Sequence, residues 1–307
     1  MKRMLGIYLV ITLLFLSACG KQSSSTEQSE KLTVTTTTSQ IADAVVNIGG
    51  EKVEVQSLMG PGTDPHLYKA TQGDISKLQK ADIIFYNGLY LEGKMLDVLE
   101  KMNKEKPTIA IGDSIDMEML LTDLDGNNAI DPHIWFDIDL WKLAVKQVEL
   151  GLIKVDPDNK SYYEKNAETY FQKLDDLNQF ATEEMEKIPS EQKVLVTAHD
   201  AFSYFGRAYR MEVLGLQGLS TDSEYGLGDV QKLVDTLVDR KIKAVFIESS
   251  ISERSINAVI EGAKKKGHNV VIGGELFSDA MGEEGTEEGT YIGMYKYNVK
   301  TIVEALK

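Results

Sequence analysis

The longest periodic stretch of the chain lies between Asp156 and Pro189. Asp156 followed by a proline is typical of a helix start, and Pro189 marks its end. Apolar residues recur inside it in alternating steps of four and three: Tyr163, Ala167, Tyr170, Leu174 and Leu177. One helix of about thirty residues would be roughly 40 Å long. Such a connection would resist wide hinge motion between the parts that it joins. Two shorter helices with a break are the alternative.

Short strand-like segments separated by helical segments occur on both sides of this stretch. The β-α-β order predicts mostly parallel sheets, with ligand loops at the carboxyl ends of the strands. The chain therefore favours an α/β fold with two lobes, residues 31–157 and 189–307, joined by one long linking helix at 158–188. The expected strands are 32–38, 53–58, 82–86 and 108–111, then 193–197, 212–216, 244–247 and 269–272.

The first eighteen residues are typical of a secretion signal. A basic start is followed by an apolar stretch, 5–16, that is too short for a comfortable membrane span. The signal ends in Leu16-Ser17-Ala18-Cys19, the pattern of a bacterial lipobox. Cleavage would leave Cys19, the only cysteine, at the N-terminus with an attached diacylglycerol lipid. Residues 19–30 are polar and predict a disordered tether. An ordinary secretion signal or a membrane anchor helix is the alternative.

The acidic composition narrows the class of partner. The chain has 48 acidic and 33 basic residues, a formal charge of −15. A surface of that sign repels the nucleic-acid backbone and attracts cations. We therefore expect no nucleic-acid partner. The lipid would place a monomeric protein on the outer face of the cytoplasmic membrane.

Three of the four histidines lie in local sequences that resemble one another. His66 and His133 each follow an Asp-Pro pair, and His199 is followed by Asp200. Proline stiffens such loops, and nearby carboxylates could fix the imidazole tautomer. Three neutral imidazoles with one carboxylate form a coordination sphere for a first-row divalent metal. Three unrelated histidines in separate loops are the alternative.

The carboxylate of this site is less determined by the pattern. Glu275 and Asp279 follow the last expected strand, and Glu248 ends the strand before it. All three positions suit a ligand loop of a parallel sheet. The fourth histidine, His268, lies in a basic helix-to-strand turn and is expected at the solvated surface.

Two other segments resemble binding motifs without completing them. Gly262 to Gly267 has the glycine spacing of a phosphate loop, but the lysine and hydroxyl residue that should follow are absent. Asp123 to Asn127 resembles the start of a calcium loop, but its glycine comes too early. The sequence therefore predicts neither a nucleotide site nor a calcium site.

The motifs together resemble the metal-binding lipoproteins of bacterial ABC importers for manganese and zinc, closest to the manganese branch. The resemblance covers essentially the whole chain after Cys19. It implies two α/β lobes with one metal between them. The implied ligands are His66, His133, His199 and Asp279, with Glu248 and Asp200 supporting them from behind. The segments that carry the resemblance are the lipobox, GPGTDPHLY, DPHIWFD, VTAHDAFSYFG, GLQGLSTDSEYG, FIESSIS and GGELFSDAMG.

Two departures within the family bear on the metal. Many manganese-binding relatives have Glu in place of His199, which weakens the manganese assignment. Zinc members usually carry a histidine-rich loop, and the corresponding stretch, residues 117–130, contains no histidine. We expect one divalent ion as cargo: Mn²⁺, then Zn²⁺, with Fe²⁺ as a further candidate.

The resemblance implies a binding protein rather than an enzyme. It would capture the ion outside the cell and deliver it to a membrane permease driven by a separate cytoplasmic ATPase. A metallohydrolase using the same His/Asp site is the alternative. Four protein ligands would leave little room for the open position that a catalytic metal keeps.

Overall fold

The computed structural model describes residues 31–122, 128–222 and 225–307. The predicted signal, Cys19, the tether and the calcium-like segment Asp123 to Asn127 lie outside the described residues. Residues 31–307 form one compact unit. None of the helices in the described ranges is long and apolar enough to cross a membrane. We call residues 32–155 the N-terminal half and residues 194–306 the C-terminal half; the predicted lobe boundaries stay a prediction.

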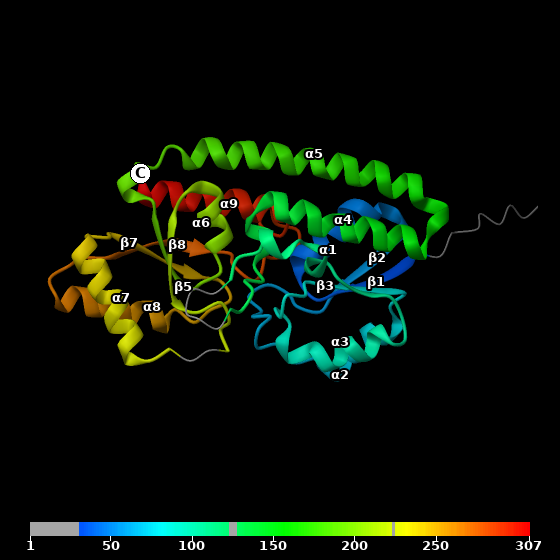
Figure 1. Ribbon diagram of the computed structural model, residues 1–307, viewed down its shortest axis with the longest axis horizontal. Helices are drawn as coiled ribbons and strands as arrows, with labels where there is room; N and C mark the ends of the chain where they lie inside the picture. The colour runs from blue at the N-terminus through cyan, green and yellow to red at the C-terminus, as the bar shows by residue number, and fades with distance from the viewer. Residues whose placement is uncertain (1–30, 123–127, 223–224) are drawn as a thin grey trace, which may run out of the picture. The chain divides into compact units, whose positions relative to one another are not determined.

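The N-terminal half is a parallel sheet with helices on both faces (Figure 1). Its strands lie in the order β2-β1-β3-β4. Along β3, Ile83 and Phe85 pack on one side with α1 and α4, whereas Ile84 packs on the other with α2 and α3. This alternation is the two-residue period of a strand. The elements are β1 (Leu32–Thr36), α1 (Ser39–Gly49), β2 (Val53–Ser57), α2 (Gln72–Lys80), β3 (Ile83–Tyr86), α3 (Leu96–Asn103), β4 (Thr108–Ala110) and α4 (Ile138–Val155).

The C-terminal half also alternates strands and helices along the chain. Strand β5 pairs in parallel with β6, β7 pairs in parallel with β8, and β5 lies beside β7. The mostly parallel α/β prediction is confirmed. The elements are β5 (Val194–His199), α6 (Ser203–Tyr209), β6 (Glu212–Gln217), α7 (Leu227–Arg240), β7 (Ala244–Glu248), α8 (Arg254–Lys265), β8 (Val271–Leu276) and α9 (Tyr291–Leu306).

The last strand lies further along the chain than predicted. The sequence placed it at 269–272, but β8 runs from Val271 to Leu276 and passes through two glycines. Gly274 has φ +152°, and a Cβ there would collide with Thr301 of α9. The pairing with β7 shifts by one residue at this point. Glycine therefore lets an irregular strand continue where the pattern indicated a loop.

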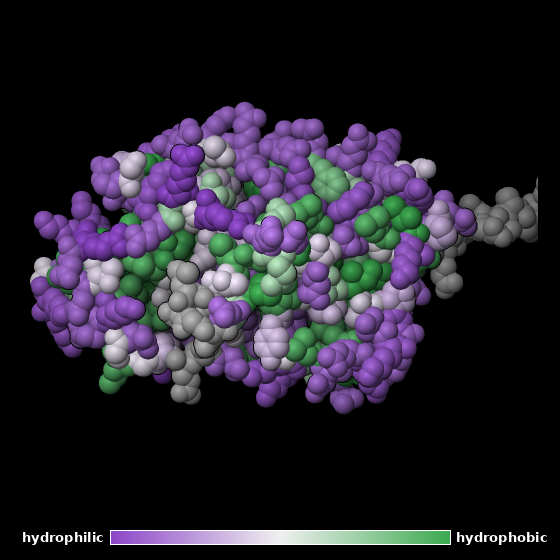
Figure 2. All heavy atoms as spheres, viewed as in Figure 1, coloured by the Kyte–Doolittle hydropathy of each residue, from purple (hydrophilic) through white to green (hydrophobic). Residues whose placement is uncertain are grey.

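The long helix is continuous. Helix α5 runs from Lys160 to Met185, 26 residues, so the alternative of two helices with a break is wrong. It packs on α1 and α4 of the N-terminal half and on α9 of the C-terminal half (Figure 1). The five apolar positions that predicted it are all buried. Hydrophilic residues surround the molecular face in Figure 2, and hydrophobic residues show between them near its middle.

Candidate metal centre

Four of the predicted site residues meet at one buried point. His66 lies in the loop after β2 and His133 in the turn before α4, whereas His199 ends β5 and Asp279 follows β8. One potential ligand atom from each lies within 4.8 Å of the others. Each half of the chain contributes two of the side chains, and all four residues are at most 4 % exposed. The carboxyl ends of parallel strands supply the C-terminal pair.

The two Asp-Pro-His segments form the same turn. The backbone N–H of His66 donates to Asp64 Oδ1 and that of His133 to Asp131 Oδ1, each at 2.9 Å. The second use of each carboxylate differs. Asp131 Oδ1 also lies 2.7 Å from Nδ1 of His133, but Asp64 Oδ2 accepts a 2.6 Å hydrogen bond from Thr221 of the C-terminal half. Asp131 thus orients the imidazole of His133, whereas Asp64 links the loop of His66 to the C-terminal half.

Glu248 plays for His199 the part that Asp131 plays for His133. Its Oε2 lies 2.6 Å from Nδ1 of His199, and its Oε1 accepts from the backbone N–H of the same residue at 2.9 Å. Asp200, expected to support the site as well, instead accepts a 2.7 Å hydrogen bond from Ser203. Glu275, one of the three acid candidates, is exposed. Among those candidates, only Asp279 lies on the Nε2 side of the imidazoles, where the four side chains meet.

The free ring nitrogens point at a common centre. Carboxylate partners place the proton of His133 and His199 on Nδ1, so that the Nε2 lone pairs face inward. Nε2 of His66 lies 3.3 Å from Nε2 of His133. Asp279 lies 3.3 Å from Nε2 of His199 and 3.5 Å from Nε2 of His133. Ligand atoms on a tetrahedron with bonds of about 2.0–2.1 Å lie roughly 3.3 Å apart, so the donor set fits a small divalent cation.

Buried polar atoms remain without partners at this centre. Within the described residues, both Asp279 carboxylate oxygens and Nε2 of His199 accept or donate no hydrogen bond. A buried carboxylate without donors is costly unless a cation compensates it. The orphaned atoms are the ones that face the centre, which is the strongest local indication of a metal.

The electrostatics fit an exchange of protons for a cation. Burial lowers the pKa of His66 to about 3. Burial also acts to lower the pKa of His133, but Asp131 and Asp279 raise it to about 9. For His199, Glu248 and Asp279 overcome burial and raise the pKa well above its usual value. Burial would raise the pKa of Asp279, but the facing imidazoles hold it well below its usual range. A metal must therefore displace protons from His133 and His199.

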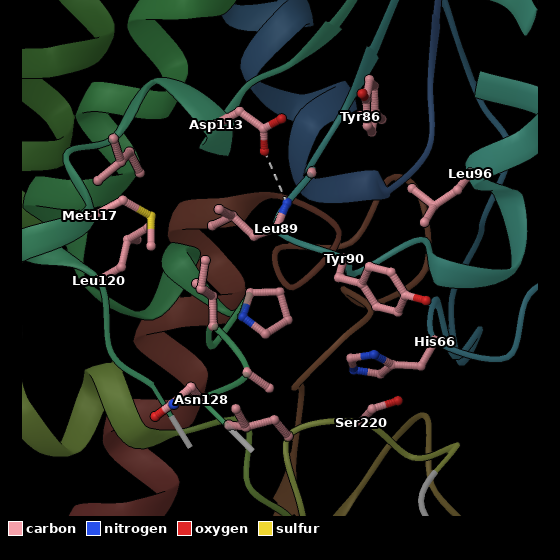
Figure 3. Close-up of a pocket in the computed structure, with 16 residues that line it drawn as sticks. His66, Tyr86, Leu89, Tyr90, Leu96, Asp113, Met117, Leu120, Asn128 and Ser220 are labelled. Atoms are coloured by element: carbon pink, nitrogen blue, oxygen red, sulfur yellow. Dashed lines mark hydrogen bonds between the residues drawn. The ribbon is translucent and has the colours of Figure 1, made fainter. Parts of the chain in front are cut away.

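A cavity of about 690 Å³ reaches the centre from one side, and His66 is the one member of the four that lines it (Figure 3). Its wall includes the segment from Gly88 to Tyr90, in which three consecutive residues have positive φ. The buried carboxylate of Glu92 accepts hydrogen bonds from the backbone N–H groups of Asn87 and Gly88 and fixes this segment. His66 is therefore the member of the four that is in contact with the cavity.

Two residues at the centre were missed by the sequence reasoning. The indole N–H of Trp135 donates to the Ser278 carbonyl, and Nε2 of Gln40 donates to the Asp279 carbonyl, each at 3.0 Å. The sequence shows that Trp135 is close to His133, because only one residue separates them. It does not show that Trp135 bonds Ser278, which is far away in the chain. His268 lies outside this cluster; it is half-buried, with Nε2 2.6 Å from the Ile242 carbonyl.

Comparison with known proteins agrees with this geometry. The family model described as zinc-uptake complex component A, periplasmic, matches residues 34–305. The manganese-binding lipoprotein MntA of Bacillus subtilis is 55 % identical over 292 residues, 95 % of each chain. The manganese ABC transporter substrate-binding lipoprotein PsaA of Streptococcus pneumoniae is 35 % identical, covering 97 % of this chain and 96 % of its own.

A solved structure extends the likeness to the fold. The periplasmic zinc-binding protein TroA of Treponema pallidum superposes with a TM-score of 0.88 at 47 % identity, covering 90 % of this chain and 99 % of its own. These relatives are binding components of transporters and lend no support to the hydrolase alternative. The chain therefore belongs to the family of periplasmic zinc-uptake complex component A, whose members are substrate-binding proteins and not enzymes.

Proposed function

We propose that the protein is the extracytoplasmic metal-binding component of an ABC importer and that its cargo is Mn²⁺. His66, His133, His199 and Asp279 bind one divalent ion, and the protein delivers it to a membrane permease powered by a cytoplasmic ATPase. One observation carries the proposal: imidazole lone pairs and a donor-free carboxylate converge in a buried centre. Such a set needs positive charge, and a divalent cation supplies it when it displaces the imidazole protons.

The choice of manganese rests on two features. The 55 % identical relative is named as manganese-binding, and residues 117–130 contain no histidine-rich segment. Against it stand three nitrogen ligands, which bind Zn²⁺ more tightly than Mn²⁺ by the usual order of stabilities. Zn²⁺ is therefore the second candidate, and Fe²⁺ the third. Selection of manganese would depend on geometry and supply rather than on raw affinity.

The decisive measurement is elemental analysis of protein purified with manganese, zinc and iron all available. One equivalent of divalent metal per chain is expected. Deletion of the gene should create a growth defect that added Mn²⁺ relieves and excess Zn²⁺ worsens. Rescue by Zn²⁺ alone would contradict the manganese assignment, and absence of bound metal would contradict the function.

The same proposal places a monomeric protein on the outer face of the cytoplasmic membrane, attached through a lipid on Cys19. The lipobox at Leu16 to Cys19 supports this anchor. Cys19→Ser should abolish lipid labelling and release the protein into the medium. Retention of the variant in washed membranes would contradict the lipid anchor.

A further inference from the structure

Asp279 reaches the metal centre without help from any donor to its carboxylate. Both carboxylate oxygens lack a hydrogen-bond partner among the residues described. A carboxylate usually takes its orientation from the groups that donate to it. The nearest polar groups in the described residues are the imidazoles themselves, at 3.3–3.9 Å, so the position of the loop backbone largely decides where these oxygens lie. The groups that fix residues 277–281, which we call the Asp279 loop, therefore also fix the ligand.

The Asp279 loop is bound to both halves of the protein. On its own half, Asn298 of α9 accepts from the backbone N–H of Phe277 at 3.0 Å and donates to its carbonyl at 2.7 Å. From the N-terminal half, Trp135 donates to the Ser278 carbonyl and Gln40 to the Asp279 carbonyl. These two bonds, and a longer one of 3.4 Å from the Met281 N–H to Oγ of Ser39, must break for the loop to carry Asp279 away from the imidazoles of the N-terminal half.

Both donors of the N-terminal half are deeply buried. Gln40 is 1 % exposed and Trp135 is 2 % exposed, whereas Ser278 is fully buried. Water cannot replace a lost donor easily at such a position, so each freed carbonyl would bear a desolvation cost. The Trp135 ring also packs edge-on against His133, with ring centroids 5.3 Å apart. Trp135 thus contacts both the ligand His133 and the loop that carries the ligand Asp279.

We infer that Trp135 and Gln40 are positioning residues that hold Asp279 against the histidines and thereby set the rate at which the metal leaves. The inference rests on the proposed function, because it assumes that the four side chains bind an ion. Neither residue touches the ion itself. Each acts on the distance between Asp279 and the imidazoles of the N-terminal half.

The test uses three variants of the full chain. Trp135→Phe keeps a buried ring but removes the N–H donor, and Gln40→Met keeps the length but removes the amide. Trp141→Phe is the matched control, because Trp141 is fully buried on α4 and its indole N–H donates to none of the residues of the Asp279 loop. Each protein is loaded with Mn²⁺ alone or Zn²⁺ alone and mixed with excess chelator in a stopped-flow instrument.

Trp135→Phe and Gln40→Met should release either ion about tenfold faster than the parent protein, the size expected for losing one buried hydrogen bond. Trp141→Phe should release it at the parental rate, although it unfolds at lower denaturant concentration. If Trp135→Phe does not fold, Gln40→Met alone decides. Parental release rates in both variants, or equal acceleration in Trp141→Phe, would overturn the inference. Absence of metal binding by the parent protein would instead overturn the proposed function.

Discussion

At the scale of single residues, the site depends on which nitrogen of each imidazole is free. Asp131 and Glu248 accept hydrogen bonds from the Nδ1–H groups of His133 and His199. The two Nε2 atoms are then committed to the centre before a metal arrives. Such preorganisation lowers the cost of ordering ligands when the ion binds.

Removal of one ligand should abolish binding without unfolding the protein. His133→Ala takes away an imidazole whose Nε2 lies 3.3 Å from that of His66. We expect bound metal to fall far below one equivalent per chain by elemental analysis, with an unchanged circular dichroism spectrum. His268→Ala is the control, because His268 bonds the Ile242 carbonyl outside the centre. Equal metal loss in both variants would contradict the ligand set.

The two acidic residues next to His199, Glu248 and Asp200, should differ in their effect on metal affinity. Glu248→Gln weakens the acceptor of the His199 proton, so metal affinity should fall by roughly 10–100-fold. Asp200→Asn should change it little, because Asp200 bonds Ser203 rather than an imidazole. Competition titration against a chelator of known affinity measures both. A larger effect from Asp200→Asn than from Glu248→Gln would show that Asp200 supports the metal site despite its bond to Ser203.

At the scale of elements, α1 and α5 meet at the half-buried carboxylate of Asp43. Asp43 accepts a 3.0 Å hydrogen bond from Tyr170. Burial raises the pKa of Asp43 to about 6 despite this bond. The folded protein therefore holds the Asp43 proton more tightly than the unfolded chain does. From this group alone, stability is lost as pH rises from about 4 to about 6.

Asp43→Asn should remove that loss. The advantage of the variant over the parent should grow across this pH window toward about 3 kcal/mol, the equivalent of two pKa units. Asparagine keeps an acceptor for Tyr170. Urea unfolding of both metal-free proteins at several pH values measures the difference, and the histidines cancel because both proteins contain them. A difference that does not vary with pH would contradict the assigned pKa.

The elements also show what the sequence could and could not predict. Helix α5 was predictable, because its period and its proline-marked ends are local signals. The choice among Glu248, Glu275 and Asp279 was not, because it depends on where β8 ends. Gly274 and the register shift beside it carry β8 on to Leu276. Only the folded arrangement therefore shows that Glu275 is exposed and that Glu248 serves His199. The resemblance to a family, not the spacing, singled out Asp279.

At the scale of the whole molecule, α5 limits how far the halves can move. It packs on helices of both halves along one unbroken length. Spin labels on cysteines placed at Glu100 of α3 and Asp239 of α7, in a Cys19→Ser background, would report the separation of the halves. Metal binding should change it by only about 1–2 Å, the scale of small helix shifts. A change of many ångströms would contradict a stiff connection.

The unbroken α5 has a consequence for traffic at the membrane. If the metal-bound and metal-free proteins have nearly the same shape, the permease must bind both. It could then distinguish them only after docking. Metal-free protein would then compete with metal-bound protein for the same docking site on the permease. Import into membrane vesicles should slow when metal-free protein is added in excess, in the manner of a competitive inhibitor. Above a certain amount of binding protein on the membrane, more of it would lower the rate of metal uptake.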